Sequence, residues 1–235
     1  MSRATQNLVL LLVALSTGVM VVKGTYLHYV KPALLPWLIA AAAVLAALAL
    51  TAIVRDLREH VAAEDGAHQH HNWMAWLLLI PIALIAFVVP PPLGAQGATP
   101  EITATDQPHL RAFPPLPPGD APTVSLPEVL MRAVTDATKS LAGRVITVTG
   151  FTMKTDGGTD IGRVVIICCA ADAQLARIHL TGPAAATAAH FPDNTWLQVQ
   201  GRVDPATANP ATHFIPTMAV TNVRQIAKPA NTYSY

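Results

Sequence analysis

Three long apolar runs in the first ninety residues constrain this chain more than any other feature. They cover residues 8–22, 36–54 and 73–89, and the second and third runs contain no charged side chain. A helix that crosses a bilayer needs about 20 consecutive apolar residues. The runs therefore predict three transmembrane helices, over about 7–30, 36–54 and 73–89, with Lys23 near the lipid headgroups.

Composition agrees with a chain that is partly embedded in lipid. Hydrophobic residues make up 52% of the 235 residues, and charged residues make up only 12%. The first run could instead be a cleaved signal peptide, although no clear small-x-small cleavage site follows it. The other two runs could be buried helices of a soluble protein, but two uncharged runs of this length favour the membrane.

The positively charged residues near the runs indicate an orientation. The side of the amino terminus has three of them and the opposite side has two: Arg3, Arg55 and Arg58 against Lys23 and Lys31. Cytoplasmic loops carry an excess of Lys and Arg, so we expect the amino terminus and residues 55–72 in the cytoplasm. Three spans of the cell membrane then place the carboxy-terminal half on the extracytoplasmic side.

The loop over residues 55–72 is rich in histidine and acidic residues. It contains His60 and the pattern His68-x-His70-His71. Neutral imidazole binds zinc, nickel and copper, so His68, His70 and His71 are candidate metal ligands. The alternative is a solvated polar loop that binds nothing.

A change of composition marks a second, carboxy-terminal domain. Residues 90–124 contain PPP and PLPP and show no apolar periodicity, which predicts an extended proline-rich linker. At Ser125 the pattern becomes helical. Ser125 and Glu128 have the spacing of a capping box for a helix over about 125–141, which Gly143 would end.

Five strand-like segments follow this helix, with a short helix predicted between the third and the fourth. They cover residues 144–153, 162–170, 175–181, 196–203 and 215–226. This order is that of an OB-fold, and Gly201 in the fourth segment predicts a bulge or a sharp bend. The expected fold class is thus membrane α plus β: three transmembrane helices, then a soluble OB-fold-like small β-barrel over 125–235 with a preceding helix. A small β-sandwich is the alternative.

Nucleic acid is excluded as a partner of this β domain. The net charge of the chain is only +1, and aromatic residues make up 6% of it. OB-folds that bind nucleic acid need a basic groove and aromatic side chains on which bases stack.

Cys168-Cys-Ala-Ala-Asp172 is the most compact chemical pattern in the sequence. Adjacent side chains point to opposite faces inside a strand, but at the end of a strand the two sulfurs can converge. Cys168, Cys169, Asp172 and His179 are then candidate ligands for a soft or borderline metal such as zinc. The alternatives are a strained vicinal disulfide, or two buried cysteines that act as small hydrophobic residues.

Several motifs give the chain a family resemblance. They are Tyr29-Val-Lys-Pro32, Val148-Thr-Gly-Phe151, Cys168-Cys-Ala-Ala-Asp172-Ala-Gln174, Trp196-Leu-Gln-Val-Gln-Gly201, Ile215-Pro216 and Lys228-Pro-Ala-Asn-Thr-Tyr-Ser-Tyr235. In these motifs the chain resembles the YcgQ-like family of bacterial membrane proteins. The resemblance implies a subunit of a two-component permease complex, with a polytopic membrane permease as its partner. It also suggests a role in the homeostasis of a metal such as zinc.

These patterns lead to one main functional hypothesis. We expect a non-catalytic subunit of a bacterial membrane permease complex, which anchors the β domain beside the permease and handles a divalent metal such as zinc. No predicted span has an ionisable residue at its centre, so this chain alone is not expected to form an ion pathway. The alternatives are a membrane-tethered thiol redox protein or sensor that uses the cysteine pair, and a structural assembly factor.

Overall fold

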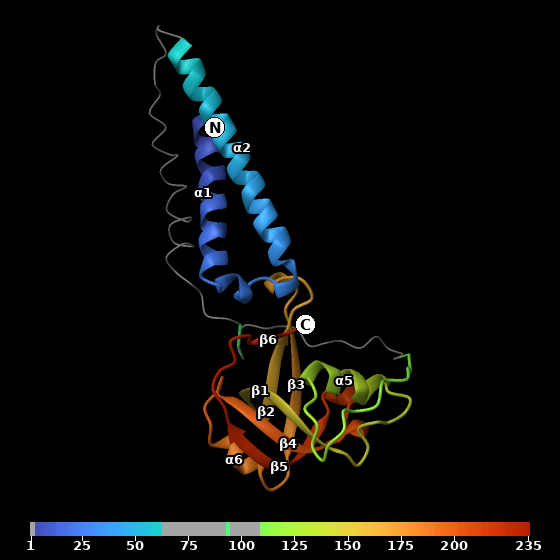
Figure 1. The fold of residues 1–235 in the computed structure, drawn as a ribbon. Helices are drawn as coiled ribbons and strands as arrows, with labels where there is room; N and C mark the ends of the chain where they lie inside the picture. Colours follow the sequence, from blue (N-terminus) through green and yellow to red (C-terminus); the bar gives the residue numbers. More distant parts are fainter. Residues whose placement is uncertain (1–2, 63–92, 95–108) are drawn as a thin grey trace. The chain divides into compact units, whose positions relative to one another are not determined.

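The structure is a computed structural model that describes residues 3–62, 93–94 and 109–235 (Figure 1). The chain divides into two compact units, Met1–Pro91 and Pro92–Tyr235. Two predictions lie outside the described residues: the third span over 73–89, and the loop that carries His68, His70 and His71.

The first unit is a pair of helices, α1 (Arg3–Val22) and α2 (Leu35–Ala62), that pack against each other. Two 3-10 turns, Thr25–His28 and Pro32–Leu34, join them. The predicted helix over 7–30 is too long at its end, because Gly24 adopts a left-handed conformation with φ of 71°. A left-handed glycine is a common end of a helix.

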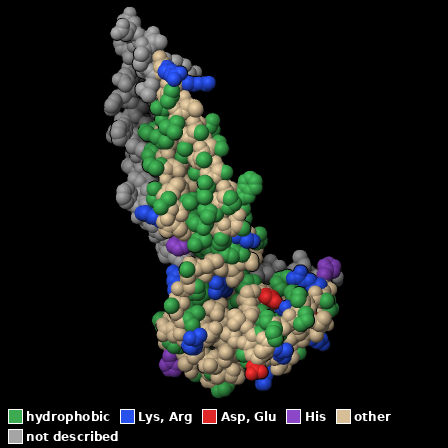
Figure 2. Space-filling model, viewed as in Figure 1, with side chains coloured by type: hydrophobic (Ala, Val, Ile, Leu, Met, Phe, Trp, Pro, Cys, Tyr) green, Lys and Arg blue, Asp and Glu red, His purple; other side chains and the backbone are tan. Residues whose placement is uncertain are grey.

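One helix in the described part of the chain is long and apolar enough to cross a membrane. It is the stretch Pro32–Arg55 near the amino terminus, and Gln6–Val22 is a shorter apolar helix. Figure 2 shows apolar side chains along this helix pair, and Trp37 and Val44 are among those exposed. Three spans are therefore not confirmed. Helix α2 also continues to Ala62, so residues 55–62 are helical where the sequence predicted a loop.

The second unit is a β-sheet with two helices. Its elements are α5 (Leu126–Thr135), β1 (Val145–Thr155), β2 (Gly158–Val165), β3 (Gln174–Thr181), α6 (Ala185–Ala189), β4 (Trp196–Asp204), β5 (Thr217–Gln225) and β6 (Tyr233–Ser234). Four of the five long strands begin and end within two residues of their predicted bounds, and α6 lies between β3 and β4 as predicted, but β2 begins four residues earlier than predicted. Strand β2 ends at Val165, so Cys168 and Cys169 lie in the turn that follows it. The two-residue strand β6 was not predicted.

The strand pairing closes the sheet on itself. The order is β1-β4-β5-β3-β2-β6, and β1 also pairs with β2. The β3–β5 and β2–β6 pairs are parallel, and the others are antiparallel. Each of the five long strands therefore has a neighbour on both sides. The register shifts between Gln200 and Gly201, so an irregularity lies at the predicted position, although the extra residue, Thr221, belongs to β5.

The helix before the sheet differs from its prediction at both ends. Ser125 is the N-cap residue but its side chain makes no capping hydrogen bond. The predicted capping box is wrong because Glu128 instead pairs with Arg132, with 2.7 Å between Oε1 and Nη2. The helix ends at Thr135, six residues before the predicted end at residue 141. It ends there because the carboxylate of Asp136 accepts backbone hydrogen bonds from Thr138 and Ser140.

Two apolar clusters fill the second unit. The larger cluster lies between α5 and the sheet and includes Val129, Ile146 and Leu197. The smaller, which we call the second cluster, consists of Phe151, Met153, Val164, Ile166, Leu175, Trp196 and Tyr233. Part of the predicted linker belongs to this unit, because the Val124 N–H donates to the Thr147 carbonyl and Leu93 packs against the second cluster.

Candidate metal centre

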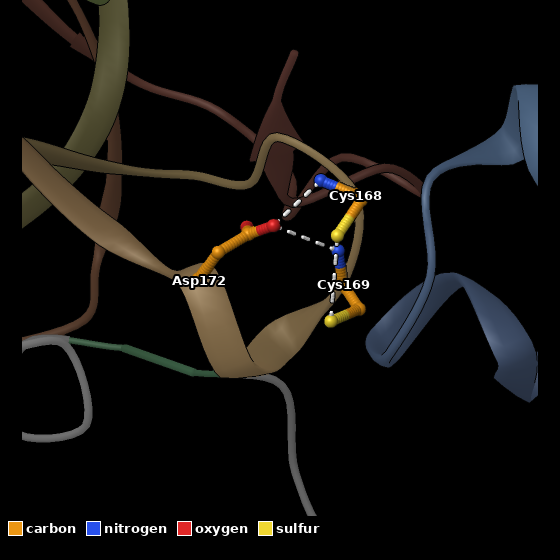
Figure 3. A group of neighbouring side chains, drawn as sticks. All are labelled: Cys168, Cys169 and Asp172. Atoms are coloured by element: carbon orange, nitrogen blue, oxygen red, sulfur yellow. Dashed lines mark hydrogen bonds between the residues drawn. The ribbon is translucent and has the colours of Figure 1, made fainter.

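The turn between β2 and β3 brings two cysteines and one carboxylate together (Figure 3). We call residues 166–173 the cysteine turn, and a 3-10 turn over Ala170–Asp172 forms its second half. The Sγ atoms of Cys168 and Cys169 are 3.7 Å apart. The three potential ligand atoms, one each from Cys168, Cys169 and Asp172, all lie within 4.8 Å of one another. The two sulfurs thus converge at the end of the strand, as the sequence predicts.

The carboxylate of Asp172 organises the backbone of the turn. Its Oδ1 accepts the Ile167 N–H at 2.8 Å. Its Oδ2 accepts the Cys168 N–H at 2.8 Å and the Cys169 N–H at 3.3 Å. Three consecutive N–H groups therefore point to one carboxylate, and this curvature places both sulfurs on the same side of the turn.

The same contacts shift the protonation of the site. The hydrogen bond with the Cys168 thiol, and then the backbone N–H groups, lower the pKa of Asp172 to about 2. The hydrogen bond to Asp172, followed by that to Cys169, raises the pKa of Cys168 to about 11. At neutral pH without metal, Asp172 is therefore ionised and Cys168 is a thiol. A protonated thiol is a poor nucleophile, so the arrangement does not favour thiol catalysis by Cys168.

Solvent exposure argues against the purely structural interpretation of the cysteines. Cys168 is exposed, Cys169 is half-buried, and both are free thiols. The alternative of two buried core cysteines is therefore wrong. A disulfide between them would also be strained, because adjacent Cα atoms are about 3.8 Å apart and disulfides usually need about 4.4–6.8 Å.

The spacing of the sulfurs fits a tetrahedral metal ion. Two thiolates that bind one Zn²⁺ at about 2.3 Å each have sulfur atoms about 3.8 Å apart. The observed distance of 3.7 Å between the sulfurs of Cys168 and Cys169 is close to this value. The donor set of two sulfurs and one carboxylate oxygen also suits a borderline ion such as Zn²⁺.

His179, the fourth predicted ligand of this site, does not join the group. It lies on β3, and its Nδ1 is 2.7 Å from Oδ1 of Asp160, whose side chain is buried on the neighbouring strand β2. Among the described residues, only Cys168, Cys169 and Asp172 form a group that could hold a metal. The other predicted ligands, His68, His70 and His71, lie outside the described residues.

A sequence comparison finds one domain family whose model matches the part of the chain that contains the cysteine turn. The family model matches residues 128–235, a stretch that includes most of α5, every strand and the turn itself. This stretch is similar to the DUF1980 C-terminal domain. No curated protein and no solved structure matches the chain.

Sequence reasoning missed the residues that connect the cysteine turn to the carboxy-terminal segment. The Ile166 N–H donates to the Ser234 carbonyl at 3.1 Å, and Arg163 reaches the same terminal segment. These residues are distant in the sequence. The only local signal was the polar-aromatic alternation of Tyr233-Ser234-Tyr235, which is too short to predict a strand.

Proposed function

We propose that the second unit binds a divalent thiophilic metal, with Zn²⁺ as the leading candidate, through Cys168, Cys169 and Asp172. One observation carries this proposal: the two sulfurs are 3.7 Å apart, the spacing that a tetrahedral zinc ion needs. The ion would replace the thiol protons, because thiolates rather than thiols bind metals.

Asp172 has a double role in this proposal. An ionised carboxylate has about four lone-pair sites, and three backbone N–H groups use three of them. One site is left for a metal ion or for the thiol of Cys168. Asp172 therefore holds the turn in shape in both states and becomes a ligand when the thiol proton leaves.

The open position of the site supports handling of a metal rather than a purely structural role. Cys168 is exposed, and Ile167 beside it is 65% exposed. Three protein ligands leave the fourth position of a tetrahedral ion to water or to an incoming donor, whereas structural zinc sites are usually closed by four protein ligands. An open site lets a metal ion arrive and leave.

The strand pairing supports an OB-fold as the carrier of this site. Around the closed sheet the strands follow the order β1-β2-β3-β5-β4, and α6 lies between β3 and β4 along the chain. This order and the parallel β3–β5 pair are those of the OB-fold barrel that the sequence predicts. A rigid barrel would present the cysteine turn on a fixed support.

The proposed location is the cell membrane. Helix α2 is long and apolar enough to cross it, and α1 and the segment over 73–89 would provide the other two spans. Ala40, Ala43 and Ala47 are exposed on α2, and small residues allow a partner helix to approach closely. We therefore propose a non-catalytic subunit that anchors the metal-binding domain beside a polytopic permease.

Metal content of the full-length chain in detergent tests the metal site. All variants would carry His68, His70 and His71 as alanine, so that the loop does not contribute binding. We expect one tightly bound Zn²⁺ per chain, lost when Cys168 and Cys169 are both replaced by alanine. His179→Gln serves as the control and should leave the stoichiometry unchanged. Equal zinc content in the chain with and without the two cysteines would contradict the proposal.

Cross-linking in membranes tests the partnership. A photo-crosslinker placed at Ala43 on α2 should capture a polytopic membrane protein in intact cells, and one placed at the exposed Thr221 of β5 serves as the control site. The proposed partnership is wrong if the adducts formed at Ala43 contain no multi-span protein.

A further inference from the structure

Both ends of the cysteine turn are tied to the second cluster. Ile166, at the first end, is fully buried in this cluster, and its N–H donates to the Ser234 carbonyl at 3.1 Å. At the other end Ala173 packs against the cluster, and Leu175 belongs to it. The turn therefore depends on the position of the carboxy-terminal segment that provides the Ser234 carbonyl.

That segment contacts β2 through the short strand β6. Val164 and Val165 pair with Tyr233 and Ser234 in parallel register. The ring of Tyr233 is only 1% exposed, and its hydroxyl accepts the Leu93 N–H at 2.9 Å. A pairing of two residues is too short to be stable by itself, because strands in proteins are usually 3–10 residues long. Side-chain contacts must hold β6 in place.

Arg163 on β2 provides such contacts. Its Nη2 donates to the Asn231 carbonyl at 3.1 Å and to the Tyr233 carbonyl at 3.2 Å. Its guanidinium lies over the ring of Trp196, 5.0 Å from the centroid. One side chain thus joins β2, the start of β4 and the carboxy-terminal segment, three residues before Ile166.

One of the hydrogen-bond donors of Arg163 has no partner in the described part of the chain. Its Nε is buried and has no hydrogen-bond partner among the residues that the structure describes. A buried donor without a partner costs free energy, which offsets part of the stabilisation from the two hydrogen bonds that Nη2 donates. The larger cluster between α5 and the sheet does not include Arg163 or β6.

We propose that Arg163 is a positioning residue for the metal centre. It holds β6 against β2, and β6 in turn fixes Ile166, so that the cysteine turn keeps its two sulfurs at the spacing of a tetrahedral ion before metal binds. This proposal rests on the proposed function, because a change in metal affinity requires that the cysteine turn binds a metal. Residues that orient metal ligands without touching the metal typically change affinity by about 10- to 100-fold when they are replaced.

The test compares two arginine substitutions in the full-length chain in detergent, with the loop histidines replaced by alanine. Arg163→Gln removes the contacts to the carboxy-terminal segment. Arg224→Gln is the matched control, because Arg224 is exposed on β5 and donates to Gln198. The Kd for Zn²⁺ from chelator competition should rise at least about tenfold in Arg163→Gln and less than about twofold in Arg224→Gln.

Two further readouts separate positioning from loss of folding. With Co²⁺ as the probe, Arg163→Gln should lose the strong visible absorption of a tetrahedral thiolate site, and Arg163→Lys should keep part of it. In the zinc-free protein, amide hydrogen exchange at Ile166 and Cys168 should become faster in Arg163→Gln, with no change at Ile146 and Val148 in the larger cluster.

Each outcome decides the proposal. Wild-type affinity and a wild-type Co²⁺ spectrum in Arg163→Gln would overturn it, as would unchanged exchange at Ile166. Faster exchange at Ile146 and Val148 as well would show that Arg163 stabilises the whole unit, which would also overturn it. If the unsubstituted chain binds no Zn²⁺, the proposed function fails, and the exchange comparison alone decides whether Arg163 positions the turn.

Discussion

Asp172 is the residue on which the chemistry of the turn depends most directly. Its carboxylate curves the backbone through three N–H groups and at the same time keeps the Cys168 thiol protonated. Without metal, the neutral thiol of Cys168 is hydrogen-bonded to the ionised carboxylate of Asp172. Exchange of this proton for a metal ion is the step that the arrangement prepares, so affinity for the metal should increase with pH.

Replacement of Asp172 should make Cys168 more reactive in the zinc-free protein. The hydrogen bond to Asp172 is the largest cause of the raised pKa of Cys168, so Asp172→Ala should lower this pKa from about 11 towards the ordinary value. The rate of alkylation by iodoacetamide at pH 8–9 should then rise, because the thiolate is the nucleophile. A slower alkylation rate in Asp172→Ala would contradict this account. Asp204→Ala, far from the thiols in the sequence and in an exposed turn, is the control.

At the scale of elements, the end of α5 depends on a buried carboxylate. Burial by itself would raise the pKa of Asp136, but hydrogen bonds from Ser140 and Thr138 outweigh it and hold the pKa far below its ordinary value. The folded state therefore prefers the ionised form more strongly than the unfolded chain does. This preference stabilises the fold above the unfolded pKa of about 3.9 and is lost as pH falls towards the folded value.

Asp136→Asn should therefore make the stability of the fold less dependent on pH in the acidic range. At pH 7 its Tm should lie below that of the unsubstituted chain, by the equivalent of about 1–3 kcal/mol for a lost charged acceptor of buried hydrogen bonds. The difference in Tm should shrink as pH is lowered from 7 to 3, because the wild-type carboxylate loses its advantage. Differential scanning fluorimetry over this pH range measures the difference in Tm between the two chains. A difference in Tm that grows as pH falls towards 3 would contradict the prediction.

The irregular pairing of β4 with β5 at Gly201 provides a second prediction for an element. A Cβ at Gly201 would collide with the backbone carbonyl of Ala219 on β5, which cannot move without breaking the sheet. Gly201→Ala should lower the free energy of unfolding by about 1–3 kcal/mol. Gly157→Ala is the matched control, since a Cβ there would meet only the His179 ring at 3.9 Å. Equal stability of the two variants would show that the sheet relaxes around this irregularity.

The elements also show how far sequence reasoning reaches. Alternating side chains predict the presence of each long strand, and Gly201 predicts where β4 and β5 pair irregularly, because these signals are local. The end of α5 was predicted too late, because the turn depends on backbone N–H groups of Thr138 and Ser140 that donate to the Asp136 carboxylate, and these residue types also occur inside helices. The convergence of Cys168 and Cys169 was predictable from their place after a strand. The support from Arg163 and β6 was not, because its partners are about 70 residues apart along the chain.

For the whole molecule, the central prediction is association with a membrane through the first unit. Helix α2 exposes large apolar side chains such as Trp37, Val44 and Leu48 over a stretch that is long enough to cross a bilayer. We expect the full-length chain to stay with the membrane pellet after alkaline carbonate extraction. A chain without residues 1–91 should not be recovered in that pellet. Release of the full-length chain by carbonate would contradict the proposed anchoring.

The closed strand order has a consequence for how other proteins can recognise the second unit. A sheet with an open edge invites an incoming strand, whether from a partner or from another copy of itself in an aggregate. Here each of the five long strands already pairs with a neighbour on both sides, so an incoming strand would find few unpaired backbone N–H and C=O groups. A protein that binds this unit would have to contact its side chains and turns, and the exposed cysteine turn is one surface that is open to such contact.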